Sequence, residues 1–359
     1  MAARHAVFHP LHVSDVERLT DDAVALTFDV PDDLREQYAF TQGQHLTVRT
    51  PLAGDEVRRN YSICSPAGDG ALRIAVKRLG GGAFSSYALD RLRPGDTLEV
   101  MTPTGRFFTQ LDPDNAKHYC CIAAGSGITP IMSIISTVLS IEPRSRVTLL
   151  FANRTTKTIM FLEELEDLKD RYHERFHLVH VLTREPADVE LFTGRIDGER
   201  LRRFLDTIIP PDSVDEWFLC GPFPMITDLR ETLNQAGVDR RHVHTELFHV
   251  ETVPPVRRPA ELADDSGGSE VTIVLDGRRS QLRLHTDDVS VLEAALAVRS
   301  DAPYACQGGV CGTCRAKLLD GTVRMDQNWA LESTELDKGY VLTCQSHPTS
   351  DTVVLDYDA

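Results

Sequence analysis

The stretch YACQGGVCGTC, residues 304–314, predicts more about this chain than any other stretch does. It places Cys306, Cys311 and Cys314 in the spacing C-x4-C-x2-C, and Cys344 follows in LTCQS. Three glycines fill the loop between these cysteines. Glycine adopts positive φ angles without strain and lets backbone N–H groups approach sulfur atoms closely. The loop therefore has the composition that wrapping around a metal cluster requires.

The spacing is typical of a [2Fe–2S] cluster of the plant type, which four thiolates hold. A zinc site and a disulfide are the two alternative uses of these cysteines. A structural zinc site prefers two C-x2–4-C pairs, and here the second pair is missing. A disulfide is disfavoured because the N-terminal residues lack the apolar core of an export signal. We therefore predict an iron–sulfur cluster with four ligands: Cys306, Cys311, Cys314 and Cys344.

Length and charge limit the remaining possibilities. A chain of 359 residues predicts two or three domains. The formal net charge of −16 argues against nucleic acid or an anionic membrane as partner. No apolar run approaches the length of a membrane span, so we expect a cytoplasmic protein. We expect Cys64, Cys120 and Cys121 to be buried core thiols because they lie in apolar stretches.

The hydrophobic pattern changes twice along the chain. Residues 1–112 contain short alternating runs such as LRIAVKR, which predict an antiparallel β-barrel. Residues 113–250 alternate apolar strands with amphipathic helices, which predicts a doubly wound parallel sheet. Residues 251–269 are rich in proline, glycine and charge, as in an inter-domain linker. Residues 270–359 form a third unit of strands, one helix and the cysteine loop.

Two motifs in the predicted barrel are candidates for binding a phosphate-bearing ligand. The first is RNYS, residues 59–62, which by itself is also an ordinary strand sequence. The second is GGAFSS, residues 81–86, which places glycines and hydroxyls where a helix is expected to begin. Free N–H groups and the helix dipole attract phosphate there, although serine also serves as a simple helix cap.

Two further motifs follow predicted parallel strands. AGSGITP, residues 124–130, lies between a strand and a helix and differs from G-x-G-x-x-G, since a proline stands near the place of the third glycine. Its glycines let the backbone approach a diphosphate, although a structural turn is the alternative. Cys220, Gly221 and Pro222 end a later strand, where α/β folds bind ligands.

The loop after the second parallel strand bears on the choice of nucleotide. It offers Arg154 and Lys157 and no acid. An acid in this position suits the ribose hydroxyls of NADH, whereas an arginine suits the 2′-phosphate of NADPH. The loop therefore favours NADPH, with NADH left open.

On these motifs, residues 59–248 resemble the ferredoxin–NADP reductase superfamily, in which an FAD domain precedes a pyridine-nucleotide domain. The resemblance implies that Arg59 pairs with the flavin diphosphate, that Tyr61 stacks on the isoalloxazine ring, and that Ser62 approaches flavin N5. It also implies a pyrophosphate cradle formed by Gly82, Phe84, Ser85 and Ser86. The C-terminal unit is similar to plant-type ferredoxin domains, which have an α+β β-grasp fold.

The same resemblance implies the nicotinamide site. It assigns nucleotide contacts to Gly125, Gly127, Thr129, Pro130, Arg154, Thr155, Cys220, Gly221 and Pro222. Ser62, Thr129 and Cys220 form the catalytic set, with Cys220 shaping the pocket beside the nicotinamide. Phe248 is the candidate for covering the flavin face opposite Tyr61, and a core position is its alternative.

The order of the three units resembles that of single-chain oxygenase reductases. Stretches such as CGPFPMI and GRIDGERL are most similar to the reductase subunits of phenylacetyl-CoA epoxidases, followed by those of ketosteroid 9α-hydroxylases. The resemblance implies electron transfer from NAD(P)H through FAD and [2Fe–2S] to a terminal oxygenase. The alternatives are a reductase serving a Rieske oxygenase, a redox-sensing module without turnover, and a flavin reductase with a vestigial C-terminal unit.

Overall fold

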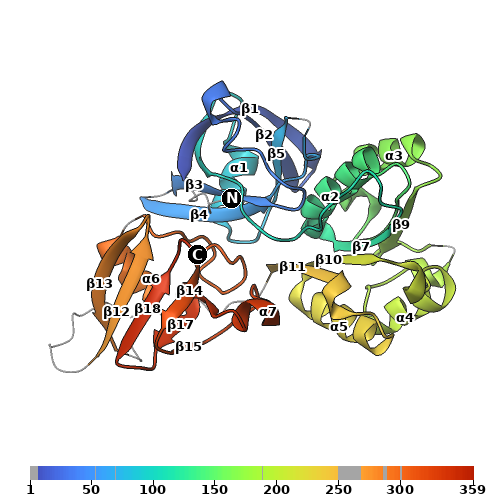
Figure 1. Ribbon diagram of the computed structural model, residues 1–359. Coiled ribbons are helices and arrows are strands. Elements are labelled where there is room, and N and C mark those ends of the chain that lie inside the picture. Colours follow the sequence, from blue (N-terminus) through green and yellow to red (C-terminus); the bar gives the residue numbers. More distant parts are fainter. Residues whose placement is uncertain are drawn as a thin grey trace. The chain divides into compact units, whose positions relative to one another are not determined.

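The computed structural model describes residues 7–52, 54–68, 70–187, 189–249, 268–285, 289–299 and 301–359. They form two compact units, one of residues 8–249 and one that includes the residues from 268 onward (Figure 1). The predicted linker, residues 251–269, lies outside the described residues except for its last two. Within the described ranges, no helix is long and apolar enough to cross a membrane.

The first unit begins with a curled antiparallel sheet of six strands in the order β4-β3-β6-β1-β2-β5. An isolated bridge between Ile63 and Ile74 links the end of β4 to β5 and closes the curl, as predicted for the barrel. The helix α1 packs Phe84 and Ala88 into the barrel core. The elements are β1 Phe8–Thr20, β2 Ala23–Asp29, β3 His45–Leu52, β4 Asp55–Ser62, β5 Leu72–Lys77, α1 Ala83–Asp90 and β6 Thr97–Met101.

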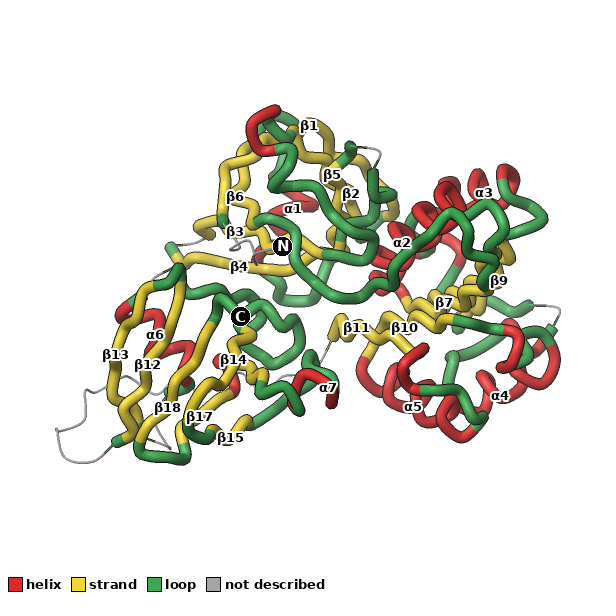
Figure 2. Tube along the Cα trace, in the orientation of Figure 1, coloured by secondary structure: helices red, strands yellow, loops and turns green. Residues whose placement is uncertain are grey.

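A five-stranded parallel sheet follows in the order β11-β10-β7-β8-β9. Helices α2 and α3 cover one face and α4 and α5 the other, which explains why the central strands are continuous apolar runs (Figure 2). The elements are β7 His118–Ala124, α2 Ile128–Ile141, β8 Arg146–Asn153, α3 Leu162–Arg171, β9 Phe176–Leu182, α4 Gly198–Thr207, β10 Glu216–Pro222, α5 Phe223–Gln235 and β11 Val243–His249. The predicted doubly wound fold is confirmed.

The strand order of this sheet fixes where a ligand can bind. β7 comes first in the chain but lies centrally, between β8 and β10, so the connections from it run in opposite directions. Open α/β sheets bind ligands outside the carboxyl ends of their strands at such a switch point. One hydrophobic core contains both Cys64 of the barrel and Ile131 of α2, so the barrel and the parallel sheet pack together. Cys64, Cys120 and Cys121 are buried, as predicted.

The second unit is a mixed sheet in the order β13-β12-β18-β14-β16, in which β12 and β18 are parallel. The helix α6 buries Val291, Leu292 and Ala295 in the core of this unit. This arrangement of helix and sheet matches the predicted β-grasp fold. The elements are β12 Ser269–Leu275, β13 Arg278–Leu284, α6 Val291–Val298, β14 Arg315–Asp320, β15 Val323–Met325, α7 Ser333–Leu336, β16 Tyr340–Leu342, β17 Ser346–Pro348 and β18 Thr352–Asp356.

Candidate functional site

Strand β4 carries the predicted flavin contacts near its end. Arg59 and Tyr61 are two residues apart, so both side chains leave the same face of the strand. Arg59 is exposed, and its Nη1 also donates to the carbonyl oxygen of Arg58 at 2.7 Å. The Tyr61 ring is tilted by 37° against that of Phe84, with 5.4 Å between the ring centroids. The strand and the start of α1 therefore meet, as the two separate motifs predict.

Gly82 stands immediately before α1, and its lack of a side chain has a structural reason. A Cβ added at Gly82 would lie 2.6 Å from Ser85 Oγ. Ser85 Oγ donates to the carbonyl oxygen of Gly82 and accepts from the amide of Leu79. Ser86 continues the helix, with its amide donating to the carbonyl oxygen of Gly82. Glycine at position 82 therefore leaves the space before the first turn of α1 free of a side chain.

The glycine turn after β7 touches the end of β10. A Cβ added at Gly127 would lie 2.2 Å from the carbonyl oxygen of Cys220 and 3.1 Å from the amide nitrogen of Gly221. Only glycine permits this approach, because real Cβ contacts are never so short. Thr129, at the start of α2, is buried and donates from Oγ1 to the carbonyl oxygen of Ser126 at 3.1 Å. Two motifs that are 93 positions apart in sequence therefore meet at one point.

Glu246 joins the predicted catalytic residues into one cluster. It lies on β11 directly beside Cys220, its partner in the parallel register with β10. Ser62 Oγ, at the end of β4, donates to Glu246 Oε2 at 3.1 Å. A serine from the barrel, a carboxyl group from β11 and a thiol from β10 thus lie together. Of the three predicted catalytic residues, Ser62 and Cys220 are linked through Glu246, and Thr129 lies on the adjoining turn.

Sequence reasoning missed Glu246. Burial raises the pKa of its carboxyl group to about 8, against the opposing effect of the Ser62 hydrogen bond. Burial, reinforced by Glu246, also raises the pKa of the Cys220 thiol well above its usual value. Both groups are therefore mostly uncharged near neutral pH.

Phe248 lies near the end of β11. Its side chain is partly buried and packs against the core shared by the barrel and α2. Partial burial is compatible with both roles predicted for Phe248, a core position and a cover for one face of the flavin.

The loop after β8 brings charged groups to the carboxyl edge of the sheet. Arg154 and Lys157 are exposed there, as expected, and the Thr155 amide donates to Thr158 Oγ1 at 3.1 Å. The structure adds an acid that the order of residues did not suggest. Glu185, from the loop after β9, accepts from both the amide and the hydroxyl of Thr156, at 3.0 and 2.6 Å. These bonds lower the pKa of Glu185 below its usual range.

The four cysteines of the second unit converge in two pairs. Cys306 and Cys311 interact as one pair, and the interaction lowers the pKa of Cys306 to about 6 and raises that of Cys311. Cys314 and Cys344 form the other pair, which lowers the pKa of Cys344 and raises that of Cys314. The Gly308 amide donates to Cys306 Sγ at 3.4 Å. The loop and the distant fourth cysteine meet as the spacing predicts.

Comparison with known proteins supplies the family. The oxidoreductase FAD-binding domain matches residues 10–109, the oxidoreductase NAD-binding domain residues 121–231, and the 2Fe-2S iron-sulfur cluster binding domain residues 273–349. The chain is 45% identical over 352 residues to a subunit of the 1,2-phenylacetyl-CoA epoxidase of Escherichia coli strain K12, with 98% of each chain covered. The chain belongs to the flavin- and iron–sulfur-containing oxygenase reductases.

Other relatives of this reductase agree. It is 34% identical over 354 residues to the ferredoxin reductase component of 3-ketosteroid-9-alpha-monooxygenase from Rhodococcus rhodochrous, with 97% of this chain and 96% of that one covered. Phthalate dioxygenase reductase shares the fold, with a TM-score of 0.60, 22% identity and 97% and 98% coverage. The reductase is an NAD(P)H-dependent oxidoreductase that uses FAD and a [2Fe–2S] cluster and supplies electrons to a terminal oxygenase.

The reductase residues fit the two nucleotide cofactors. The side-chain-free approach at Gly82 and the exposed guanidinium of Arg59 match the needs of a diphosphate. Gly127 packs against Cys220 and places backbone atoms, without a side chain, at the switch point of the sheet. The side-chain amide nitrogen of Asn153, at the end of β8, is buried and has no hydrogen-bond partner among the described residues. Such an orphaned donor favours a bound ligand at this edge.

The cysteine pairs fit a two-iron cluster. A [2Fe–2S] cluster takes two thiolates on each iron, and the pairs Cys306–Cys311 and Cys314–Cys344 supply them.

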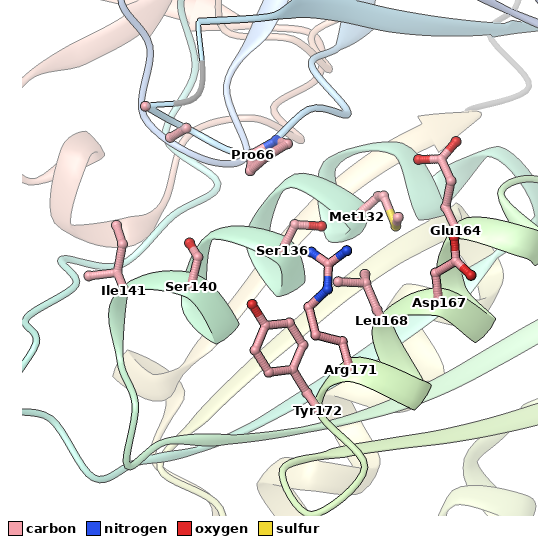
Figure 3. A pocket seen from close by; sticks show the side chains of 12 residues that line it. Pro66, Met132, Ser136, Ser140, Ile141, Glu164, Asp167, Leu168, Arg171 and Tyr172 are labelled. Atoms are coloured by element: carbon pink, nitrogen blue, oxygen red, sulfur yellow. The ribbon is translucent and has the colours of Figure 1, made fainter.

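A cavity of about 640 Å³ lies elsewhere in the reductase unit. Figure 3 shows Arg171 and Tyr172 facing Ser136 and Ser140 of α2 across it, with Pro66 above. None of the predicted site residues is among the residues that line it. The predicted site residues therefore lie apart from this hollow.

Proposed function

We propose that this protein is the reductase component of a phenylacetyl-CoA epoxidase. The observation that carries the proposal is the 45% identity to a subunit of such an enzyme, which extends over 98% of both chains. The reductase components of 3-ketosteroid-9-alpha-monooxygenases, at 34% identity, support the second candidate. Both candidates share the same electron path and differ in the oxygenase that receives the electrons.

We propose the following roles for the residues of the first unit. Bound FAD would supply the conversion of a hydride into single electrons, and the cluster would supply one-electron transfer. Arg59 holds the diphosphate, and Tyr61 supports the flavin ring. Ser62 is positioned by Glu246, and Cys220 excludes water beside the nicotinamide. The direct support is the Ser62–Glu246 hydrogen bond of 3.1 Å next to the buried Cys220.

The proposed site contains the remaining predicted contacts. The flavin side would take in Gly82, Phe84, Ser85, Ser86 and Phe248. The nucleotide side would take in Gly125, Gly127, Thr129, Pro130, Arg154, Thr155, Gly221 and Pro222. The cluster ligands would be Cys306, Cys311, Cys314 and Cys344. The exposed cations Arg154 and Lys157 support NADPH as the donor, with NADH as an alternative.

We also propose the domain limits and the location of the protein. The proposed domains are residues 1–112, 113–250 and 270–359, with a linker at 251–269; the family matches at 10–109, 121–231 and 273–349 support these limits. A cytoplasmic location is supported by the use of a nicotinamide nucleotide and by eight cysteines that form no disulfide.

A docking surface for the oxygenase is proposed beside the cluster loop. The segment 326–337 carries four acids, of which Asp326 pairs with Arg324 and Glu335 with Arg315, while Glu332 and Asp337 are exposed. It includes the exposed side chains of Trp329 and Leu336, and the Trp329 amide donates to the carbonyl oxygen of Gly309 at 3.0 Å. Exposed acids beside apolar anchors fit a basic patch on the oxygenase. Rates of oxygenase reduction should fall as salt is raised, and rates that ignore salt would contradict this docking mode.

Reconstitution tests the proposed function. The reductase is mixed with the oxygenase subunits of a phenylacetyl-CoA epoxidase or with a ketosteroid 9α-hydroxylase oxygenase, and NADPH consumption is measured with and without each substrate. Consumption coupled to phenylacetyl-CoA alone supports the proposal. Coupling only to the steroid would favour the second candidate. NADPH-dependent reduction of cytochrome c separates either reductase from a module without turnover, and removal of the C-terminal unit tests for a simple flavin reductase.

A further inference from the structure

The loops after β8 and β9 lie side by side at the carboxyl edge of the parallel sheet. The Thr183 amide donates to the carbonyl oxygen of Asn153 at 2.9 Å, and the Arg184 amide donates to that of Arg154 at 2.8 Å. The parallel pairing of β8 and β9 therefore continues beyond the ends of both strands. It places the residues just after β9 against the loop after β8, where we expect the nucleotide ribose.

Glu185 is that residue, and its carboxylate is held in place. It accepts from the Thr156 hydroxyl at 2.6 Å and from the Thr156 amide at 3.0 Å. Thr156 is the second residue after Arg154 and the first after Thr155, both proposed nucleotide contacts. The side chain of Glu185 is half-buried while those of Arg154 and Arg184 are exposed, so an anchored anion lies beside solvent-exposed cations. Lys157 also interacts electrostatically with Glu185.

We propose that Glu185 is a specificity-determining residue for the nicotinamide nucleotide, because its anchored carboxylate disfavours the 2′-phosphate of NADPH and accepts the ribose hydroxyls of NADH. A carboxylate repels a phosphate dianion, whereas a ribose 2′-hydroxyl donates a hydrogen bond to it. Arg154, Lys157 and Arg184 act in the opposite sense. The balance between these three cations and Glu185 sets the coenzyme preference of the reductase. This inference rests on the proposed nucleotide site.

The test compares two probes that differ only in the 2′-phosphate, 2′,5′-ADP and 5′-AMP. Their dissociation constants are measured by calorimetry on the oxidised holoprotein, so that turnover does not enter. The variant is Glu185→Gln, which removes the charge but keeps a carbonyl oxygen for the Thr156 bonds. The matched control is Glu174→Gln, an exposed glutamate that precedes β9 at the opposite edge of the sheet. It makes the same charge change away from the proposed site.

Glu185→Gln should raise the affinity for 2′,5′-ADP relative to that for 5′-AMP about tenfold, which corresponds to about 1.4 kcal/mol. Glu174→Gln should leave the ratio unchanged. An unchanged ratio in Glu185→Gln would overturn the inference. Equal weakening of both probes would also overturn it, since Glu185 would then only hold the loop. If neither probe bound the unaltered protein, the proposed nucleotide site itself would be wrong, and the inference with it.

Discussion

Replacement of Glu246 by glutamine tests whether the cluster at the barrel edge holds a neutral carboxyl group. The folded state raises the pKa of Glu246 from 4.5 to about 8. Between these pH values the folded protein keeps a proton that the unfolded chain releases. The stability of the unaltered protein should therefore fall as pH rises from about 4.5 to about 8. A glutamine side chain carries no such proton and would still accept from Ser62, so Glu246→Gln should lack this loss.

The size of the effect follows from the pKa difference. The full shift corresponds to roughly 5 kcal/mol, which partial exposure of Glu246 reduces to roughly 3 kcal/mol. In a unit of this size, 1 kcal/mol moves the melting temperature by about 2–4 °C. As the pH rises from about 4.5 to about 8, the melting temperature of Glu246→Gln should therefore gain roughly 6–12 °C relative to that of the unaltered protein.

The assay is thermal unfolding of the holoprotein across this pH range, with Glu174→Gln as the control for loss of one negative charge. Only the pH-dependent part of the difference counts, because the substitution can also add a constant offset. Parallel profiles for Glu246→Gln and the unaltered protein would refute the reasoning, since Glu246 would then ionise like an exposed glutamate.

Three further substitutions test separate parts of the site. Gly127→Ala should cost about 1–3 kcal/mol of folding stability and weaken NADP⁺ binding, because its Cβ would lie 2.2 Å from the Cys220 carbonyl oxygen. Gly80→Ala is the control, since a Cβ there would meet nothing within 4 Å. Equal melting temperatures for the two variants would contradict the tight contact. Cys306→Ser should lose iron and cytochrome c reduction while NADPH still bleaches the flavin absorbance, and full iron content would exclude Cys306 as a ligand. Arg59→Ala should weaken FAD binding about 10–100-fold in equilibrium dialysis, the loss expected for a charge-assisted hydrogen bond; unchanged affinity would remove Arg59 from the flavin site.

The fold and most residues of the candidate site could be predicted because their signals are local. The strand and helix periods, the glycine turn at residues 125–127 and the cysteine loop each lie within a few neighbouring residues. Glu246 and Glu185 could not be predicted in this way. Glu246 meets Ser62 across 184 positions of sequence, and Glu185 meets Thr156 across 29. An isolated glutamate carries no pattern. The packing of the barrel against the parallel sheet brings Glu246 to Ser62, and the parallel register of β8 and β9 brings Glu185 to Thr156.

The central claim is that this chain separates the electron pair of a nicotinamide nucleotide and releases single electrons through iron. An anaerobic titration of the purified protein with NADPH, followed by absorption and electron paramagnetic resonance, tests it most directly. The account predicts flavin and iron–sulfur absorption in the oxidised protein, followed on titration by bleaching of both and by the resonance signal of a reduced [2Fe–2S] cluster. Bleaching of the flavin with no reduced-cluster signal, in protein that contains iron and acid-labile sulfide, would contradict it.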